Sequence, residues 1–390
     1  MSERPESEAG FVPPVYPFDK LTEFDTLASR LDGGMVDLSV GTPCDAPSPK
    51  VVEALGHSGS ERGYPAALGS SELREAAARW IERRFKITLD PASELAACIG
   101  TKEFVAGVPH WLRLRTPSRD TVLYPGLAYP TYEMGALLAR CRAVAVPARP
   151  DGSLDLAAVA AEDAARALCL WVNSPGNPAG QLEDLAECAA WGRDHGVPVF
   201  SDECYVEFTW EGPGRSILED GLDGVVAVHS LSKRSNLAGV RSGIYAGDPE
   251  LVGYLAALRR HAGFMVPGPV QHASAAAFDD DESVVSQRLV YSERLSYLAA
   301  VLTGAGIPAT TPGGGFYLWV RVPDRLSGDG TVSPAFSMAR WLAEHAGVLV
   351  SPGDAYGPTG RSHVRFALVQ PNERLELIAE RLVSSRAAGP

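Results

Sequence analysis

The sharpest chemical signal in the sequence is a lysine that lies shortly after an apolar run. Lys233 follows the apolar residues 225–228. A lysine at the end of a buried strand is costly as a cation, so it either reaches water or works as an amine of lowered pKa. The hydroxyls of Ser230 and Ser232 and the guanidinium of Arg241 offer donors to a phosphate. Taken alone, the motif also fits a kinase-like or a purely structural Ser-Lys cluster.

Lysine is rare in this chain, which narrows the choice of a Schiff-base residue. The five lysines are Lys20, Lys50, Lys86, Lys102 and Lys233. The first three lie on predicted surface helices or their edges, where a solvated side chain is expected. Lys233 is therefore the leading candidate for a lysine that forms a Schiff base.

Polar groups also follow three other predicted strands. These groups are Asp202 and Tyr205, Asn177, and the junction Gly100-Thr101-Lys102. Each has an ordinary structural interpretation: a turn cap for Asp202, a tight connection around Asn177 and a common strand-to-helix junction at Gly100. Because parallel strands end at one edge of a sheet, and amides at a helix start hold anions, the same groups can also converge on one ligand.

The elements that must position these groups alternate along the chain. Apolar runs predict strands at 95–99, 121–124, 167–172, 197–201 and 225–229. Amphipathic periodicity predicts helices at 71–85, 102–114, 132–140 and 182–195. Continuously apolar strands that alternate with helices indicate a mostly parallel sheet covered on both faces. The expected fold class is α/β.

Beyond about residue 280 the alternation is lost. Helices are predicted at 283–302, at 334–346 and from about 372, and strands at 316–322, 348–351 and 363–368. This order favours a second, α+β domain. We therefore expect an N-terminal arm and first helix (1–40, with the helix at about 21–31), a large domain (41–280) and a small domain (281–390).

Composition and charge exclude several classes of protein. With 390 residues, 45% hydrophobic and 21% charged, the chain is an ordinary globular protein. Its formal charge of −13 has the wrong sign for binding nucleic acid or an anionic membrane surface. Neither a signal-peptide pattern nor an apolar run of about 18 residues is present, so a cytoplasmic protein is expected. The six scattered cysteines predict reduced thiols, and no metal is expected.

Taken in order, the four motifs resemble the fold-type I pyridoxal 5′-phosphate enzymes, specifically the aspartate aminotransferase superfamily (class I/II). Further matching segments are 38–43, Gly63-Tyr64-Pro65, 128–132 and Arg365 within 363–366. The resemblance covers essentially the whole chain. It is strongest to actinobacterial N-succinyldiaminopimelate aminotransferases (DapC type), through segments 100–103, 202–205, 232–238, 265–267 and 351–358. It implies a large domain with a mostly parallel seven-stranded sheet and a smaller α+β domain.

The resemblance also implies a role for each candidate residue. Lys233 would hold the cofactor as a Schiff base and then move a proton between the substrate Cα and the cofactor. Asp202 would keep the pyridine nitrogen protonated. Tyr205 and Asn177 would contact the ring 3-oxygen, and Tyr129 would stack on the ring.

Two further sets complete the implied site. Residues that would seat the cofactor phosphate or lie beside it are Gly100, Thr101, Lys102, Ser230, Ser232 and Arg241, with Tyr64 supplied by the other subunit of a homodimer. Residues that would bind substrate are Arg365, which would clamp the α-carboxylate, with Gly41, Asn177 and Tyr16. A second substrate carboxylate could be met by Lys102, Arg234 or another arginine.

The implied activity is a transaminase that moves an amino group from L-glutamate to N-succinyl-2-amino-6-ketopimelate, in lysine and diaminopimelate biosynthesis. One alternative is a transaminase for another amino acid in specialised metabolism. Another is a pyridoxal-phosphate-dependent C–S lyase. A cofactor-binding regulatory domain is disfavoured, because neither end carries a basic helix-turn-helix segment.

Overall fold

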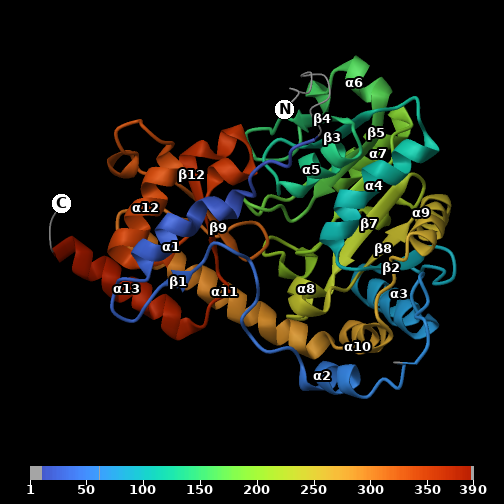
Figure 1. The fold of residues 1–390 in the computed structure, drawn as a ribbon, viewed down its shortest axis with the longest axis horizontal. Coiled ribbons are helices and arrows are strands. Elements are labelled where there is room, and N and C mark those ends of the chain that lie inside the picture. Colours follow the sequence, from blue (N-terminus) through green and yellow to red (C-terminus); the bar gives the residue numbers. More distant parts are fainter. Residues whose placement is uncertain (1–10, 61, 388–390) are drawn as a thin grey trace, which may run out of the picture.

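A seven-stranded sheet forms the centre of the larger part of the molecule (Figure 1). The computed structural model describes residues 11–60 and 62–387, so residues 1–10 of the predicted arm lie outside the described residues. The strand order is β2-β8-β7-β6-β5-β3-β4, and β8 runs in the opposite direction to the other six strands. The strands are β2 (Leu95–Cys98), β3 (Thr121–Pro125), β4 (Arg142–Val146), β5 (Ala167–Asn173), β6 (Val199–Asp202), β7 (Val225–Ser230) and β8 (Gly243–Gly247).

Helices cover both faces of this sheet and bury two separate apolar cores. One core joins the sheet to α2 (Pro49–Gly56), α3 (Ser71–Phe85), α7 (Leu185–His195) and α10 (Gly268–Phe278). The other joins it to α4 (Thr101–Arg115), α5 (Thr131–Leu138) and α9 (Pro249–His261). Strands β5 and β7 are buried along their whole length, which explains why their sequences are continuously apolar.

The smaller part contains two small sheets and the C-terminal helices. Strands β9 (Tyr317–Arg321), β11 (Ser351–Pro352) and β12 (His363–Ala367) form an antiparallel sheet in the order β11-β12-β9. Strand β1 (Val36–Asp37) pairs in parallel with β10 (Val348–Leu349). The helices are α1 (Thr22–Ala28), α11 (Asp281–Gly304), α12 (Pro334–Ala346) and α13 (Asn372–Ala387).

The N-terminal segment and the C-terminal third share one hydrophobic core. Phe24 and Ala28 of α1 lie in the same buried cluster as Met338 and Leu342 of α12. Figure 1 shows the blue α1 beside the orange α12 and the red α13, while the long α11 runs from the large part to this cluster. Helix α1 is thus packed against residues more than 300 positions later in the chain.

The predicted fold class, α/β with a mostly parallel seven-stranded sheet and a smaller α+β part, is confirmed. Two details differ. The predicted strand 348–351 is divided between two sheets, since β10 pairs with β1 and β11 pairs with β12. The predicted helix at 21–31 already ends at Ala28. None of the helices within the described residues is long and apolar enough to cross a membrane.

Candidate active site

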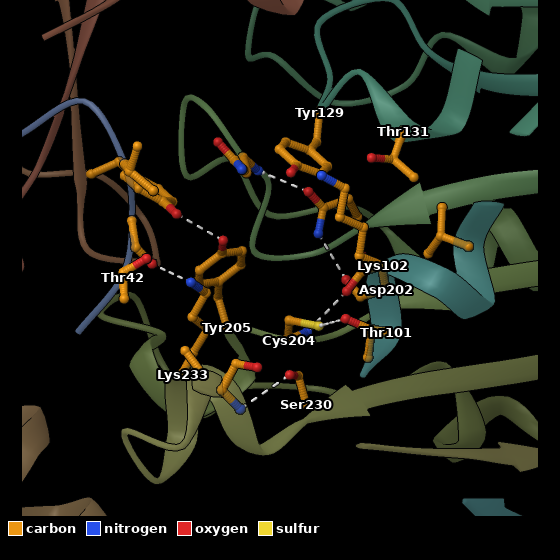
Figure 2. A pocket seen from close by; sticks show the side chains of 18 of the residues that line it. Thr42, Thr101, Lys102, Tyr129, Thr131, Asp202, Cys204, Tyr205, Ser230 and Lys233 are labelled. Atoms are coloured by element: carbon orange, nitrogen blue, oxygen red, sulfur yellow. Dashed lines mark hydrogen bonds between the residues drawn. The ribbon is translucent and has the colours of Figure 1, made fainter. Parts of the chain in front are cut away.

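Three adjacent parallel strands bring their polar ends together at one edge of the large sheet. Asn173, the last residue of β5, is level with Asp202 at the end of β6, and Asp202 is level with Val228 of β7. The chain segments that follow these strands therefore begin side by side. They border a cavity of about 410 Å³, and Figure 2 shows Asp202, Tyr205 and Lys233 among the side chains that line it.

Most of the residues singled out in the sequence line this one cavity. They are Tyr16, Gly41, Thr101, Lys102, Tyr129, Asn177, Asp202, Tyr205, Ser230, Ser232, Lys233, Arg241 and Arg365. Gly100 adjoins the cavity, because a Cβ there would lie 2.3 Å from Nη2 of Arg241. Tyr64 is not among the lining residues, and it is fully exposed.

Lys233 lies on α8 (Leu231–Arg234), the short helix that follows β7. Ser230 begins this helix, and its hydroxyl accepts a hydrogen bond from the Ser232 amide at 3.1 Å. The ammonium of Lys233 donates to the backbone carbonyl of Gly41. Burial lowers the pKa of Lys233 to about 8, which makes the neutral amine accessible near neutral pH.

Asp202 is a buried carboxyl with neutral donors around it. Its Oδ2 accepts from the Tyr132 hydroxyl at 2.9 Å, and its Oδ1 accepts from the Cys204 amide at 3.2 Å. Burial raises the pKa of Asp202, and the bonds from Cys204 and Tyr132 offset part of this effect. Within the described part of the chain, no Lys, Arg or His forms an ion pair with Asp202. A bound cationic donor would meet an uncompensated carboxylate here.

An anion seat lies at the start of α4. Gly100 has φ of 72°, a left-handed conformation that favours glycine, and it precedes the first residue of the helix, Thr101. The guanidinium of Arg241 occupies the space that a side chain on Gly100 would fill, and it donates to Ser232 Oγ at 3.4 Å. A helix start, a guanidinium and two serine hydroxyls are the donors that bind a phosphate.

Arg365 projects from β12 of the smaller part and is only 2% exposed. It donates to Asn177 Oδ1 at 2.7 Å and to the Ser39 carbonyl at 2.5 Å. The guanidinium carbon lies 4.2 Å from the ring centroid of Tyr317 and 5.0 Å from that of Tyr356. Nε of Arg365 has no hydrogen-bond partner among the described residues, so a buried donor remains for a carboxylate.

Lys102 contacts Tyr16 of the N-terminal segment, and both residues line the cavity. Its Nζ donates to the Tyr16 hydroxyl at 3.2 Å and lies over the rings of Tyr16 and Tyr129 at 4.9 and 5.6 Å. Burial lowers the pKa of Lys102, but the neighbouring phenols of Tyr129 and Tyr16 raise it by more, so the pKa lies above its usual value. The side chain is thus a cation at neutral pH.

Arg234, the other suggested reader of a second carboxylate, does not reach the cavity. It is buried and pairs with Glu207 at 3.2 Å and Asp281 at 3.0 Å. Of the possibilities that the sequence left open for a second carboxylate, Arg234 is therefore not favoured by its position. Although it follows Lys233 directly on α8, Arg234 donates to the Phe278 carbonyl at the end of α10 and to Asp281 at the start of α11.

Among the lining residues to which sequence reasoning assigned no role are Tyr132, Tyr317 and Cys204. Tyr132 bonds Asp202, Tyr317 bonds the Tyr205 hydroxyl at 2.8 Å, and Cys204 contacts Thr101 Oγ1 at 3.3 Å. Tyr132 lies on α5, and Tyr129 lies just before that helix, so the short distance between them in the sequence is the signal that could have indicated Tyr132. Tyr317 comes from the far smaller part, and only the fold brings it here.

Comparison with known proteins gives a family match over most of the chain. Residues 33–382 match the family model described as "Aminotransferase class I and II". The chain is 39% identical over 377 residues to 4-dedimethylamino-4-oxo-anhydrotetracycline transaminase OxyQ of Streptomyces rimosus, covering 95% of this chain and 99% of OxyQ. It is 40% identical over 377 residues to the probable aminotransferase Rv1178 of Mycobacterium tuberculosis, covering 95% of this chain and 85% of Rv1178.

A solved structure shares the fold closely. The probable N-succinyldiaminopimelate aminotransferase of Thermus thermophilus superimposes with a TM-score of 0.82 at 33% identity, covering 94% of this chain and 99% of that one.

Proposed function

Because the chain belongs to the class I and II aminotransferases, which use pyridoxal 5′-phosphate, we propose that it transfers an amino group between L-glutamate and a keto acid. The observation that carries this proposal is the convergence of Lys233, Asp202 and Arg365 on one cavity. When bound, the cofactor supplies an aldehyde carbon and a pyridine ring that withdraws electrons. Everything else in the reaction falls to residues of the chain.

The residues of the cavity fit this cofactor. The Gly100 and Arg241 cradle fits a phosphate, and Asp202 without a cationic partner fits a protonated ring nitrogen. Tyr129 would stack on the ring, and Tyr205 and Asn177 would face the ring oxygen. Residues that would contact the phosphate or lie beside it are Gly100, Thr101, Lys102, Ser230, Ser232 and Arg241.

Lys233 would carry the mobile proton. Its amine is buried, its pKa is lowered to about 8 by burial, and the carbonyl of Gly41 accepts from it. A group with a pKa near the working pH can both take a proton from the substrate Cα and return one. Lys233 is also the lysine that would bond covalently to the cofactor.

Arg365 would bind the α-carboxylate of the donor and of the acceptor in turn. Its planar guanidinium is fixed by Asn177 and by the rings of Tyr317 and Tyr356, so it can meet a carboxylate in a two-point contact without losing further rotamer entropy. Gly41 and Tyr16 border the same substrate space. The ammonium of Lys102 is the remaining cation for a second carboxylate.

A homodimer is part of the proposal. The exposed Tyr64 would reach the phosphate of the neighbouring subunit, and the exposed arm residues Phe11, Val12 and Val15 would pack on that subunit. The division into an arm (1–40), a large domain (41–280) and a small domain (281–390), and a cytoplasmic location, remain predictions.

For the keto acid we propose N-succinyl-2-amino-6-ketopimelate. The support is the likeness to the Thermus thermophilus protein at 33% identity. A second candidate is an acceptor of specialised metabolism. It is favoured by the 39% identity with OxyQ over 99% of that enzyme, which is named as a transaminase of 4-dedimethylamino-4-oxo-anhydrotetracycline.

The test begins with borohydride reduction of the holoenzyme and peptide mapping. A pyridoxyl group on Lys233 supports the proposal, and a label on another lysine contradicts it. Purified enzyme is then assayed with L-glutamate against a panel containing the succinylated keto acid and polycyclic ketones, and amino products are identified by mass. Release of pyruvate or ammonia from sulfur amino acids without an acceptor would instead identify a C–S lyase.

A further inference from the structure

Two phenols meet inside the cavity from different parts of the chain. The hydroxyls of Tyr205, which follows β6, and Tyr317, which opens β9, lie 2.8 Å apart, and the dashed line at the Tyr205 hydroxyl in Figure 2 marks this bond. Tyr317 is 2% exposed and Tyr205 is 7% exposed. Because both are buried, each hydroxyl needs its partner, and one of them must donate to the other.

The surroundings hold Tyr317 in a fixed position. The guanidinium carbon of Arg365 lies 4.2 Å from its ring centroid, and Phe316 packs at 4.8 Å. A Cβ on Gly41 would lie 2.2 Å from the Tyr317 hydroxyl, so glycine at this position leaves the space that the hydroxyl occupies. The Tyr317 hydroxyl thus lies between Gly41 and the hydroxyl of Tyr205.

The positive charge of Arg365 decides which phenol donates. A cation over an aromatic ring stabilises negative charge on it, which makes the phenol more acidic and a stronger donor. Arg365 lies over Tyr317, so Tyr317 is the stronger donor of the two. The other titratable groups around this pair include Lys233 on α8, Cys204 after β6, Tyr129 before α5, Tyr291 of α11 and Tyr356.

We propose that Tyr317 is a positioning residue that donates its hydroxyl proton to Tyr205 and so aims the hydrogen of Tyr205 at the ring oxygen of the bound cofactor. The inference rests on the proposed function. A chain of hydrogen bonds strengthens each member, so Tyr205 is a better donor with Tyr317 behind it than alone. Tyr317 acts through Tyr205 and needs no contact with the cofactor.

The test is a spectrophotometric pH titration of the holoenzyme. A donor to the ring oxygen holds negative charge there and lowers the pH at which the bound cofactor loses its proton. Tyr317→Phe keeps the ring over Arg365 and removes only the donor. It should raise the pKa of the absorbance change by up to about one pH unit, the scale of one hydrogen bond, and by less than Tyr205→Phe does.

A double-mutant cycle separates this role from a structural one. In a Tyr205→Phe background, Tyr317→Phe should add no further shift, because the effect passes through Tyr205. Tyr356→Phe is the matched control: Tyr356 also flanks Arg365, at 5.0 Å, but its hydroxyl bonds Ser351 and not Tyr205. It should leave the absorbance pKa unchanged.

The outcomes are distinct. An unchanged absorbance pKa in Tyr317→Phe overturns the inference, and a lowered one means that Tyr205 donates to Tyr317 instead, which overturns it as well. Should Tyr317→Phe not fold, Tyr317→Met also removes the hydroxyl donor to Tyr205 and should raise the absorbance pKa in the same way. A wild-type protein that binds no chromophore at all would refute the proposed function rather than the role of Tyr317.

Discussion

Arg365 and Asn177 are joined by a hydrogen bond of 2.7 Å although 188 residues separate them in the chain. Arg365 belongs to β12 of the smaller part, and Asn177 lies in the loop after β5 of the large sheet. The backbone amide of Asn177 in turn donates to Asn173 Oδ1 at 2.8 Å, so the last residue of β5 fixes the loop. Arg365, which we propose to bind the substrate carboxylate, is therefore held by residues of both parts of the molecule.

Replacing Arg365 by lysine should not be a conservative change. A lysine has no planar two-point contact and cannot keep the bonds to both Asn177 and Ser39. We expect a loss of about 2 to 5 kcal/mol in kcat/KM, shared by all donors and acceptors. The measurement is kcat/KM for glutamate and for alanine, with the exposed Arg361→Lys as control.

The comparison of the two donors decides the orientation of the substrate. If Arg365→Lys spares alanine and cripples glutamate, Arg365 reads the distal carboxylate and the substrate lies the other way round.

Replacing Asp202 by asparagine should reduce turnover more than cofactor affinity. The anion seat at Gly100 and Arg241 is a separate part of the cavity, whereas the electron-withdrawing ring depends on the Asp202 charge. The rate of the half-reaction with the amino donor should fall well over tenfold, which exceeds about 1.4 kcal/mol. Stopped-flow measurement of that half-reaction and a cofactor titration test this.

Tyr132→Phe provides a graded comparison for the same carboxylate. It removes the hydroxyl that donates to Asp202 at 2.9 Å. The activation free energy of the same half-reaction should rise by about 1 kcal/mol, the scale of one hydrogen bond. An Asp202→Asn enzyme that stays within tenfold of wild type would show that Asp202 has another role.

Sequence patterns predicted the helices and strands that are determined by neighbouring residues in the chain. Helix 71–85 was predicted at its observed bounds because an amphipathic run follows Ser70, whose hydroxyl accepts from the Leu73 amide at 3.2 Å. The apolar runs gave β5 and β7 because strands buried on both faces carry no alternation.

Strand β8 was missed because its sequence begins and ends with glycine, which ordinarily weakens a strand. The neighbouring backbone explains both residues. A Cβ on Gly243 would lie 2.6 Å from the His229 carbonyl, and a Cβ on Gly247 would lie 2.1 Å from the Val225 carbonyl. Glycine is required there by the close approach of β7, which no local pattern reveals.

Some residues of the candidate site could likewise be predicted from local sequence patterns, and others could not. Asp202 ends β6, and Asn177 and Lys233 lie in the segments that follow β5 and β7, so the order of predicted strands indicates that all three lie near one sheet edge. Tyr317 and the burial of Arg234 depend on how the smaller part docks on the large sheet, and a pattern read along the chain carries no information on that.

Arg234 should matter for stability and not for substrate choice. It is 3% exposed and its ion pairs with Glu207 and Asp281 join α8 to neighbouring elements. Arg234→Ala leaves buried carboxylate and carbonyl oxygens without this donor, so we expect a loss of about 3 kcal/mol in the free energy of unfolding. Urea denaturation measures it.

The matched control is Arg79→Ala. Arg79 also pairs with a carboxylate, Asp279, at 2.6 Å, but its side chain is 51% exposed, so the loss should stay within about 1 kcal/mol. The ratio of kcat/KM for glutamate and alanine should be unchanged in a folded Arg234 variant. A selective loss of glutamate would return Arg234 to the substrate site.

Glu203, the neighbour of Asp202, should make the stability depend on pH. It is 1% exposed, its Oε1 accepts from the Ile217 amide at 2.8 Å, and its Oε2 lies 3.4 Å from Nε2 of the buried His229. Burial raises the pKa of Glu203 to about 8, and burial lowers the pKa of His229 to about 3. Both groups are therefore uncharged at pH 7, with the carboxyl able to donate to the imidazole.

The sign of the effect follows from the raised pKa of Glu203. Between the unfolded pKa of about 4.3 and the folded pKa of about 8, the folded state binds the extra proton, so the stabilising contribution of this proton is lost as pH rises through that window. Glu203→Gln keeps the acceptor for Ile217 and never ionises. Relative to wild type, its free energy of unfolding should rise with pH by at most about 1.4 kcal/mol per unit.

Urea denaturation of both proteins at pH 5.5, 6.5, 7.5 and 8.5 measures this difference, and Glu203→Ala serves as control. Alanine leaves the Ile217 amide without an acceptor, so this variant should be less stable than Glu203→Gln at every pH. A difference between Glu203→Gln and wild type that stays flat across the four pH values would mean that Glu203 is ionised in the folded protein throughout. The pair with His229 would then be an ion pair, and its loss would destabilise the Gln variant equally at each pH.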